Sequence, residues 1–230
     1  MGTPVKKSEP ENVANVVDLY VDQLGPCGIP LMRLRHAACI VGDHLYIHGG
    51  RSGYRALRDF WRLNLKRLEW EAIQPINQTV GSRPGLLEDH IMVNYGSNLF
   101  LIGSGSDYLN RQEMQIWKFC PESWNWSRWI ACKNSREHPL GRRSATGTMV
   151  ANKLYIFGGI VDLYAKPTAD LIELDLDNQA WSIVETWGPF VISPIYGHST
   201  NFYSGRLIVF GGIKDQKAQN AVWSFDLSKS

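Results

Sequence analysis

The sequence predicts an all-β protein made of four similar units, because three kinds of marker recur at one spacing. The first is a glycine that ends a short alternating strand, as in HLYIHGG (residues 44–50); it recurs in steps of 54, 55 and 53 residues at Gly49, Gly103, Gly158 and Gly211. The second is an apolar residue of the following strand: Trp61, Trp117, Ile172 and Trp223. The third is a tryptophan one strand later: Trp70, Trp126 and Trp181. A period shared by independent markers indicates an internal repeat.

Each unit contains four strand-like runs, which in the first unit cover residues 37–42, 44–50, 60–65 and 68–73. Short polar turns, typical of tight hairpins, are predicted between the first two runs. These turns are Gly42-Asp43, Ser97-Asn98, Asn152-Lys153 and Ser204-Gly205. No segment shows a sustained helical period. Four antiparallel strands repeated at about 50 residues describe one blade of a β-propeller.

The marker residues have structural roles in such a blade. A glycine pair lets the second strand leave the blade without a side chain in the way, and the pairs are Gly49-Gly50, Gly158-Gly159 and Gly211-Gly212. In the second unit Gly103 is followed by Ser104. The tryptophan of the fourth strand offers a large flat surface that fills space between neighbouring blades.

On these residues the chain resembles the kelch-repeat β-propellers. The motif residues of the first unit are Arg35-His36, Leu45-Tyr46-Ile47, Gly49-Gly50, Trp61 and Trp70. The third unit matches best, whereas the second has Phe100 in place of the usual tyrosine. The resemblance implies a kelch-type propeller of about four blades. Because kelch rings more often have five to seven blades, it also implies a short or incomplete ring, such as a truncated isoform or a fragment.

The predicted domain organisation is a disordered tail over residues 1–15 and a propeller over 16–230. The blade units cover about 33–80, 81–138, 139–190 and 191–230. The last unit ends just after its third strand. Because residues 18–23 align with 181–186, we expect residues 16–24 to complete the last blade, which would remove an exposed sheet edge.

Composition narrows the classes of partner. The net charge is +2, with 44% hydrophobic and 20% charged residues, which favours neither nucleic acid nor a membrane surface. The start of the chain lacks an apolar signal segment, so we expect a cytoplasmic protein. The four cysteines form no CxxC pair, which argues against zinc. They are Cys27, Cys39, Cys120 and Cys132. We therefore expect no metal and no cofactor.

The histidines leave one alternative open. His36, His90 and His198 each lie 13 residues before a marker glycine, and the third unit offers Ser144 there. Radial symmetry could bring these imidazoles together in the central channel, where they could bind a metal. The simpler interpretation is that each one ties its own blade's loop to the backbone. No GxSxG, P-loop or HExxH motif is present. We expect no enzyme; the alternative is a small-molecule or metal-dependent enzyme in the channel.

The loops carry the candidate site. Loops that follow the second strand and loops between blades gather on one propeller face. Arginine grips carboxylates with two hydrogen bonds, and arginine with aromatic residues is typical of binding hot spots. The predicted partner-binding residues are Arg51, Tyr54, Arg55, Arg58, Arg83, Tyr108, Arg111, Arg136, Arg142, Tyr164 and Tyr196. They predict a face that binds an acidic or carboxylate-ended peptide of a protein partner. The kelch resemblance implies substrate recognition for a ubiquitin ligase, or scaffolding.

Overall fold

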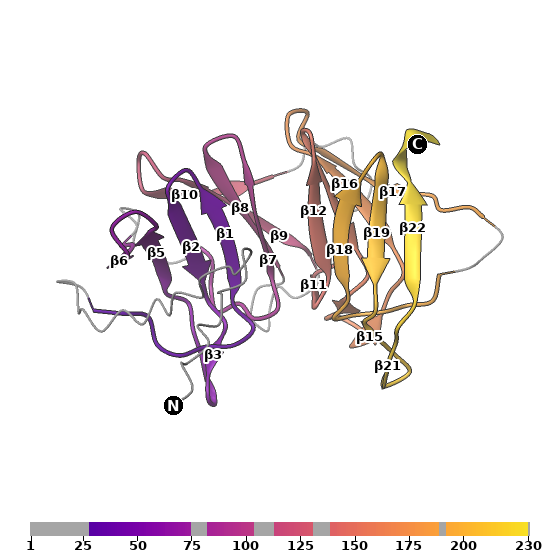
Figure 1. Cartoon of the computed structure of the whole chain (residues 1–230), viewed down its shortest axis with the longest axis horizontal. Coiled ribbons are helices and arrows are strands. Elements are labelled where there is room, and N and C mark those ends of the chain that lie inside the picture. Colours follow the sequence, from indigo (N-terminus) through magenta and orange to yellow (C-terminus); the bar gives the residue numbers. More distant parts are fainter. Residues whose placement is uncertain (1–27, 75–81, 104–112, 131–138, 189–191, 230) are drawn as a thin grey trace, which may run out of the picture.

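The computed structural model describes residues 28–74, 82–103, 113–130, 139–188 and 192–229, and these residues are almost entirely β-structure (Figure 1). Four antiparallel sheets follow one another along the chain, as the repeat predicts. Blade 1 has the order β1 (Ala37–Val41), β2 (His44–His48), β5 (Phe60–Asn64) and β6 (Glu69–Ala72). Blade 2 has the order β7 (Ile91–Tyr95), β8 (Asn98–Gly103), β9 (Gln115–Cys120) and β10 (Asn125–Trp129).

The second half of the chain repeats this plan. Blade 3 consists of β12 (Thr146–Val150), β13 (Lys153–Phe157), β16 (Leu171–Asp175) and β17 (Ala180–Val184). Blade 4 has three strands among the described residues, β18 (Ser199–Tyr203), β19 (Arg206–Phe210) and β22 (Val222–Asp226), followed by the short helix η1 (Leu227–Lys229). Within the described ranges, no helix has the length and apolar character that crossing a bilayer requires.

Two of the predicted hairpin turns are shifted by one residue. Gly42-Asp43 and Ser204-Gly205 connect their strands as expected. In blades 2 and 3 the turns begin one residue earlier, at Gly96 and Ala151, and both of these residues have positive φ (60° and 55°). Asn98 already pairs with Tyr95, and Lys153 with Val150, so both predicted turn residues belong to strands. Gly96 could have indicated the register in blade 2, because glycine accepts positive φ. Ala151 offers no such signal in blade 3, because alanine rarely adopts positive φ.

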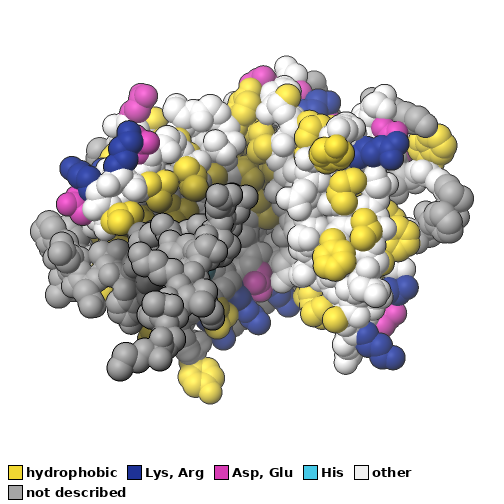
Figure 2. Space-filling view, in the orientation of Figure 1, with side chains coloured by type: hydrophobic (Ala, Val, Ile, Leu, Met, Phe, Trp, Pro, Cys, Tyr) yellow, Lys and Arg dark blue, Asp and Glu magenta, His cyan; other side chains and the backbone are white. Residues whose placement is uncertain are grey.

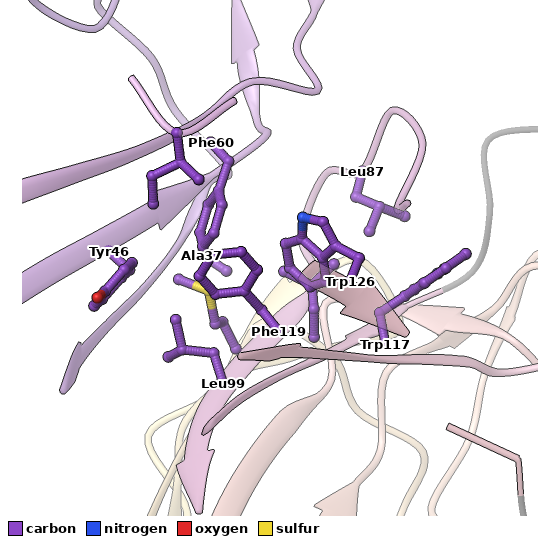
Figure 3. Close-up of a cluster of buried hydrophobic side chains, with 11 residues drawn as sticks. Ala37, Tyr46, Phe60, Leu87, Leu99, Trp117, Phe119 and Trp126 are labelled. Carbon is purple, nitrogen blue, oxygen red and sulfur yellow. The ribbon is translucent and has the colours of Figure 1, made fainter. Parts of the chain in front are cut away.

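The blades pack against one another through three apolar cores. The first core lies between blades 1 and 2, where the Trp126 ring is 5.1 Å from Phe60 and 5.0 Å from Phe119, centroid to centroid (Figure 3). Leu99 and Tyr46 are buried beside these rings. An aromatic side chain buries about 150–250 Å², so Trp126 contributes much of this interface. Trp126 therefore fills the space between two blades, as the repeat position predicts.

A belt of backbone hydrogen bonds connects the innermost parts of successive blades. The Asp89 amide donates to the Arg35 carbonyl (3.0 Å), Ser144 donates to Asp89 (2.9 Å), and Gly197 donates to Ser144 (2.9 Å). All four residues have positive φ, between 52° and 64°. They occupy one position of the repeat, just before the innermost strand. The belt fixes the spacing of the blades independently of side-chain packing.

The four innermost strands lie side by side in chain order, β1, β7, β12 and β18. The described residues do not form a closed ring, because β18 contacts β12 and blade 4 does not return to blade 1 (Figure 1). This arrangement confirms the all-β propeller fold and its four-stranded antiparallel blades. The predicted completion of the last blade by residues 16–24, like the predicted tail over residues 1–15, lies outside the described residues.

Candidate functional site

Three small hairpins project from one end of the blades, at the lower side of Figure 1. They follow the glycine pairs of blades 1, 3 and 4, where a second strand ends. Their strands are β3 (Arg51–Ser52) with β4 (Arg55–Ala56), β14 (Ile160–Val161) with β15 (Lys166–Pro167), and β20 (Ile213–Lys214) with β21 (Lys217–Ala218). A further short strand, β11 (Arg142–Arg143), pairs with β14. We call this end of the molecule the hairpin face.

A groove opens on the hairpin face between blades 1 and 2. Its volume is about 480 Å³, and three of the predicted arginines line it: Arg55, Arg58 and Arg83. Arg55 comes from strand β4, Arg58 follows that hairpin, and Arg83 lies in the connection to blade 2. The apolar part of its walls includes Leu57, Phe60, Ile73, Pro84, Leu86 and Trp126. The groove thus combines a basic rim with apolar walls.

One carboxylate, Asp59, also lines the groove, but other groups neutralise it. Arg33 grips both of its oxygens at 2.8 Å, and the Trp61 indole donates to it at 2.7 Å. Burial raises the pKa of Asp59, but the hydrogen bonds from Arg33 and Trp61 outweigh burial and lower it. Asp59 is therefore ionised and already paired within blade 1.

Unlike Asp59, the three groove arginines, Arg55, Arg58 and Arg83, have no ion-pair partner among the described residues. Arg55 and Arg58 are exposed, and Arg83 is half-buried. Their charges are therefore available to an anionic group that enters the groove. A carboxylate beside apolar side chains is the chemistry that fits these walls.

A second groove occupies the equivalent place between blades 2 and 3. Its volume is about 210 Å³, and Ile116, Trp129 and Trp181 line it where Phe60, Ile73 and Trp126 line the first. Its cation Arg128 lies over the Trp117 ring, at 5.2 Å from the centroid. It also contains the carboxylate of Glu113. The first groove is therefore the larger and the more basic of the two.

Two other predicted arginines, Arg51 and Arg142, are bonded to other groups of the chain. Arg51 donates to Glu88 at 3.0 Å, which ties the first hairpin to the loop of blade 2. Arg142 is buried; it donates to the Gly158 carbonyl at 3.3 Å and lies 3.5 Å from Asp170. Burial lowers the pKa of Arg142, and the nearby Asp170 opposes this effect. Both guanidinium groups are thus held by groups of the chain itself, away from the groove.

The predicted aromatic residues lie apart from one another. Tyr54 is fully exposed at the tip of the first hairpin, and Tyr164 is exposed at the tip of the β14–β15 hairpin. Tyr196 is half-buried, and its backbone pairs with Ile213. Three further predicted residues lie outside the described ranges: Tyr108, Arg111 and Arg136. Sequence reasoning missed the apolar walls, although Ile73 could have been found as the repeat equivalent of Trp129.

The histidines join neighbouring blades. His90 Nε2 is 3.2 Å from His48 Nδ1 of blade 1, and His198 Nε2 is 2.9 Å from Thr146 Oγ1 of blade 3. His36, at the same repeat position of blade 1, is exposed. The interpretation that each histidine ties its own blade's loop is therefore wrong for His90 and His198, because their partners belong to the preceding blade.

The third blade has no histidine at this repeat position. Thirteen residues before Gly158 stands Ala145 rather than Ser144; Ser144 belongs to the backbone belt one residue earlier. Within the described ranges, no three His, Cys, Asp or Glu side chains are grouped so that they could hold a metal ion. Cys39 and Cys120 are free thiols there, whereas Cys27 and Cys132 lie outside the described residues.

Gly49, which lies close to the His90 ring, allows a prediction about stability. A Cβ on Gly49 would lie 2.6 Å from the Leu87 carbonyl oxygen, and Gly49 also has φ of +61°. Gly53 has a similar φ of +55° but open space around it. We expect Gly53→Ala to cost about 1–2 kcal/mol of unfolding free energy for its conformation, and Gly49→Ala about 1 kcal/mol more. Urea unfolding followed by tryptophan fluorescence measures both; equal losses would contradict the close blade contact.

Comparison with known proteins gives both a family and relatives. Residues 14–186 and 128–230 match the family described as the KLHDC2/KLHL20/DRC7 Kelch-repeats domain. Acyl-CoA-binding domain-containing protein 4 of Arabidopsis thaliana is 30% identical over 212 residues, which are 89% of this chain and 31% of that protein. Kelch domain-containing protein 3 of Rattus norvegicus is 27% identical over 199 residues (80% and 49%), and Host cell factor of Drosophila melanogaster is 27% identical over 216 residues (80% and 14%). The chain spans less than half the length of each of these relatives.

Proposed function

Because the chain belongs to the kelch-repeat family, whose domains generally bind proteins, we propose that it binds a carboxylate-bearing peptide segment of a protein partner in the groove between blades 1 and 2. The observation that carries this proposal is the set of three arginines, Arg55, Arg58 and Arg83, that line an apolar groove with no ion pair among the described residues. Peptide carboxylates are the anionic groups most common on protein partners. They match the two-pronged geometry of guanidinium groups.

The apolar walls complete the proposed recognition. Phe60, Ile73 and Trp126 offer apolar and aromatic surface next to the arginines, so a segment with an apolar side chain near its carboxylate would fill the groove. Aromatic and arginine side chains together carry most of the binding energy in typical interfaces. Tyr54, exposed at the tip of the neighbouring hairpin, would contact residues of the partner beyond the groove. The carboxylate belongs to an Asp or Glu side chain or to a free C-terminus.

The test uses a displayed library of random peptides with free C-termini and compares three proteins. Wild type should enrich acidic or carboxylate-ended sequences, and the variant Arg55→Glu/Arg58→Glu/Arg83→Glu should bind them at least about tenfold more weakly, since one charge-assisted hydrogen bond contributes about 1.5–3 kcal/mol. The matched control Lys166→Glu/Lys214→Glu/Lys217→Glu makes the same charge change on the other two hairpins and should bind nearly as wild type. Amidated copies of the enriched peptides distinguish a C-terminal carboxylate from a side-chain carboxylate.

Two outcomes would contradict the groove proposal. Enrichment of neutral or basic peptides would exclude carboxylate recognition. Equal weakening by the two triple variants would mean that general positive charge, and not the groove, attracts the peptide. Added salt should weaken binding to wild type more than binding to the groove variant, because screening acts on the charges that the variant removes.

We also propose that the partner segment belongs to a substrate of a ubiquitin ligase or to a protein that the chain scaffolds. The family relationship supports this use, since kelch domains generally act as interaction modules. Coprecipitation of tagged wild type and the groove variant from cell extract tests it: a ligase component captured with both proteins, together with a substrate lost only from the variant, is the expected result. The accompanying proposal of a cytoplasmic location is tested by imaging the same tagged protein in cells.

A further inference from the structure

Each blade packs through two different faces. We call the face toward the next blade in the chain the forward face, and the face toward the preceding blade the rear face. In β8, Leu99 and Leu101 belong to the core shared with blade 1, whereas Phe100 and Ile102 belong to the core shared with blade 3. The alternation continues in β13, whose forward residues Tyr155 and Phe157 pack against blade 4. Every described interface therefore joins a forward face to a rear face.

Blade 4 has a forward face without a described blade against it. Its rear residues Leu207 and Val209 are buried against blade 3, so the intervening Ile208 and Phe210 point the other way. Phe210 is 53% exposed, and on the same face Val222 is 64% and Tyr203 is 73% exposed. Hydrophobic side chains are visible over the strands of blade 4 in Figure 2. Phe210 is the repeat equivalent of Phe157, which is fully buried. The same type of side chain is thus buried in one blade and exposed in the other.

Blade 1 offers the complementary rear face. Leu45 and Ile47 occupy the repeat positions of Leu99 and Leu101, and Ile40 lies across from Leu45 on the neighbouring strand. Ile47 and Leu63 of this face are buried, but Ile40 on the innermost strand is 55% exposed, so the accessible part of the rear face is its inner edge. The open arc therefore ends in one forward face and one rear face.

Hydrogen-bonding groups are complementary in the same way. The Gly50 amide donates to the Leu87 carbonyl of the next blade (2.8 Å), and the Gly159 amide donates to Ile195 (2.9 Å). The equivalent donor of blade 4 is the Gly212 amide, for which no backbone acceptor is found in the described part of the chain.

The matching groups stand at the other end of the arc. The acceptor equivalent to Leu87 and Ile195 is the carbonyl of Arg33, and the backbone belt likewise begins at Arg35 and stops at Gly197. His36 is exposed where its equivalents His90 and His198 reach the preceding blade. The exposed apolar side chains and these hydrogen-bonding groups therefore indicate the same contact, between the forward face of blade 4 and a rear face like that of blade 1.

We infer that the chain binds a second copy of itself head to tail, with the forward face of blade 4 on the rear face of blade 1 of the other copy. The three interfaces within the chain are the template for this contact, because each is formed by the same pair of faces. Such a contact is heterologous: it closes into a ring if the rotation allows and otherwise continues into longer oligomers. Exposed apolar side chains lie at both ends of the arc, Phe210 and Val222 at one and Ile40 at the other, and such residues are common at protein interfaces.

The test blocks one end at a time. Phe210→Asp places a charge on the forward face, and Ile40→Asp places one on the rear face; both side chains are exposed, so the variants should fold, which circular dichroism verifies. Sedimentation velocity at increasing protein concentration should show dimers or longer oligomers for wild type and monomers for each variant alone. An equal mixture of the two variants should form a dimer, because one keeps its rear face and the other its forward face. Leu163→Asp, at the tip of another hairpin, should associate as wild type.

Three results would overturn this inference. Wild type that stays monomeric at all concentrations would mean that something other than a second copy covers these faces. Single variants that associate as strongly as wild type would place the contact elsewhere on the molecule. A mixture that remains monomeric, although wild type associates, would show that two like faces meet.

Discussion

Trp126→Ala should lower the free energy of unfolding by about 3–5 kcal/mol, the usual cost of truncating a buried aromatic side chain. Trp126 is buried between blades 1 and 2, with the rings of Phe60 and Phe119 at about 5 Å. Truncation would leave a cavity that rigid strands on both sides cannot collapse to fill. Urea unfolding followed by far-ultraviolet circular dichroism measures the loss.

Trp70→Ala is the matched control, because Trp70 occupies the same repeat position in blade 1. Trp70 is half-buried, and its face of blade 1 meets no preceding blade among the described residues. We expect Trp70→Ala to lower the free energy of unfolding by less than half as much as Trp126→Ala. Losses of equal size would mean that the tryptophan stabilises its own sheet and not the contact between blades.

The second large effect is a loss of stability in mild acid. His48 and His90 are both buried and share one hydrogen bond, in which one ring donates and the other accepts. Burial lowers the pKa of His48 to about 4, with Asp59 opposing, and it lowers the pKa of His90 well below its usual value. A histidine whose folded pKa is lowered contributes stability above its unfolded pKa of about 6.5, and this stability is lost as the pH falls toward the folded value.

Protonation of His48 alone should therefore lower the free energy of unfolding by about 3 kcal/mol as the pH falls from 6.5 to 4. His198, whose pKa burial lowers to about 4, adds to this loss. Asp59 does not cancel the trend, because its lowered pKa places its titration below this pH range. Urea unfolding at a series of pH values measures the slope.

The neighbouring interface supplies the control. Between blades 2 and 3, the positions of His48 and His90 are occupied by Ile102 and Ala145. The variant His48→Phe/His90→Ala should flatten the pH dependence and leave a smaller slope from His198. Phe is the residue that blade 3 carries at the position of His48. An unchanged slope in this variant would assign the acid sensitivity to other groups.

Local patterns in the sequence determined much of this fold. Strand alternation and the glycines Gly49 and Gly158, which have positive φ, are properties of short segments. Their recurrence at one spacing, together with that of Trp70 and Trp126, identifies the units. The repeat therefore predicted the blades, their strand order and the residues between them. It failed by one residue at two hairpin turns: in blade 2 both Gly96 and Asn98 accept positive φ, and in blade 3 the pairing of the strands holds Ala151 in a conformation that its own preference does not predict.

The candidate site depended on contacts that no local pattern contains. Arg51 and Arg58 look alike in the sequence, yet Arg51 is paired with Glu88, 37 residues away, and Arg58 lines a groove. Arg142 is buried by the packing of its own blade. His90 was identified by its repeat position, but its partner His48 lies in another blade. The strands and turns could be predicted from the sequence, because their preferences are local. Which charges remain available and which faces stay open could be seen only in the folded protein, because both depend on what the neighbouring blade brings into contact.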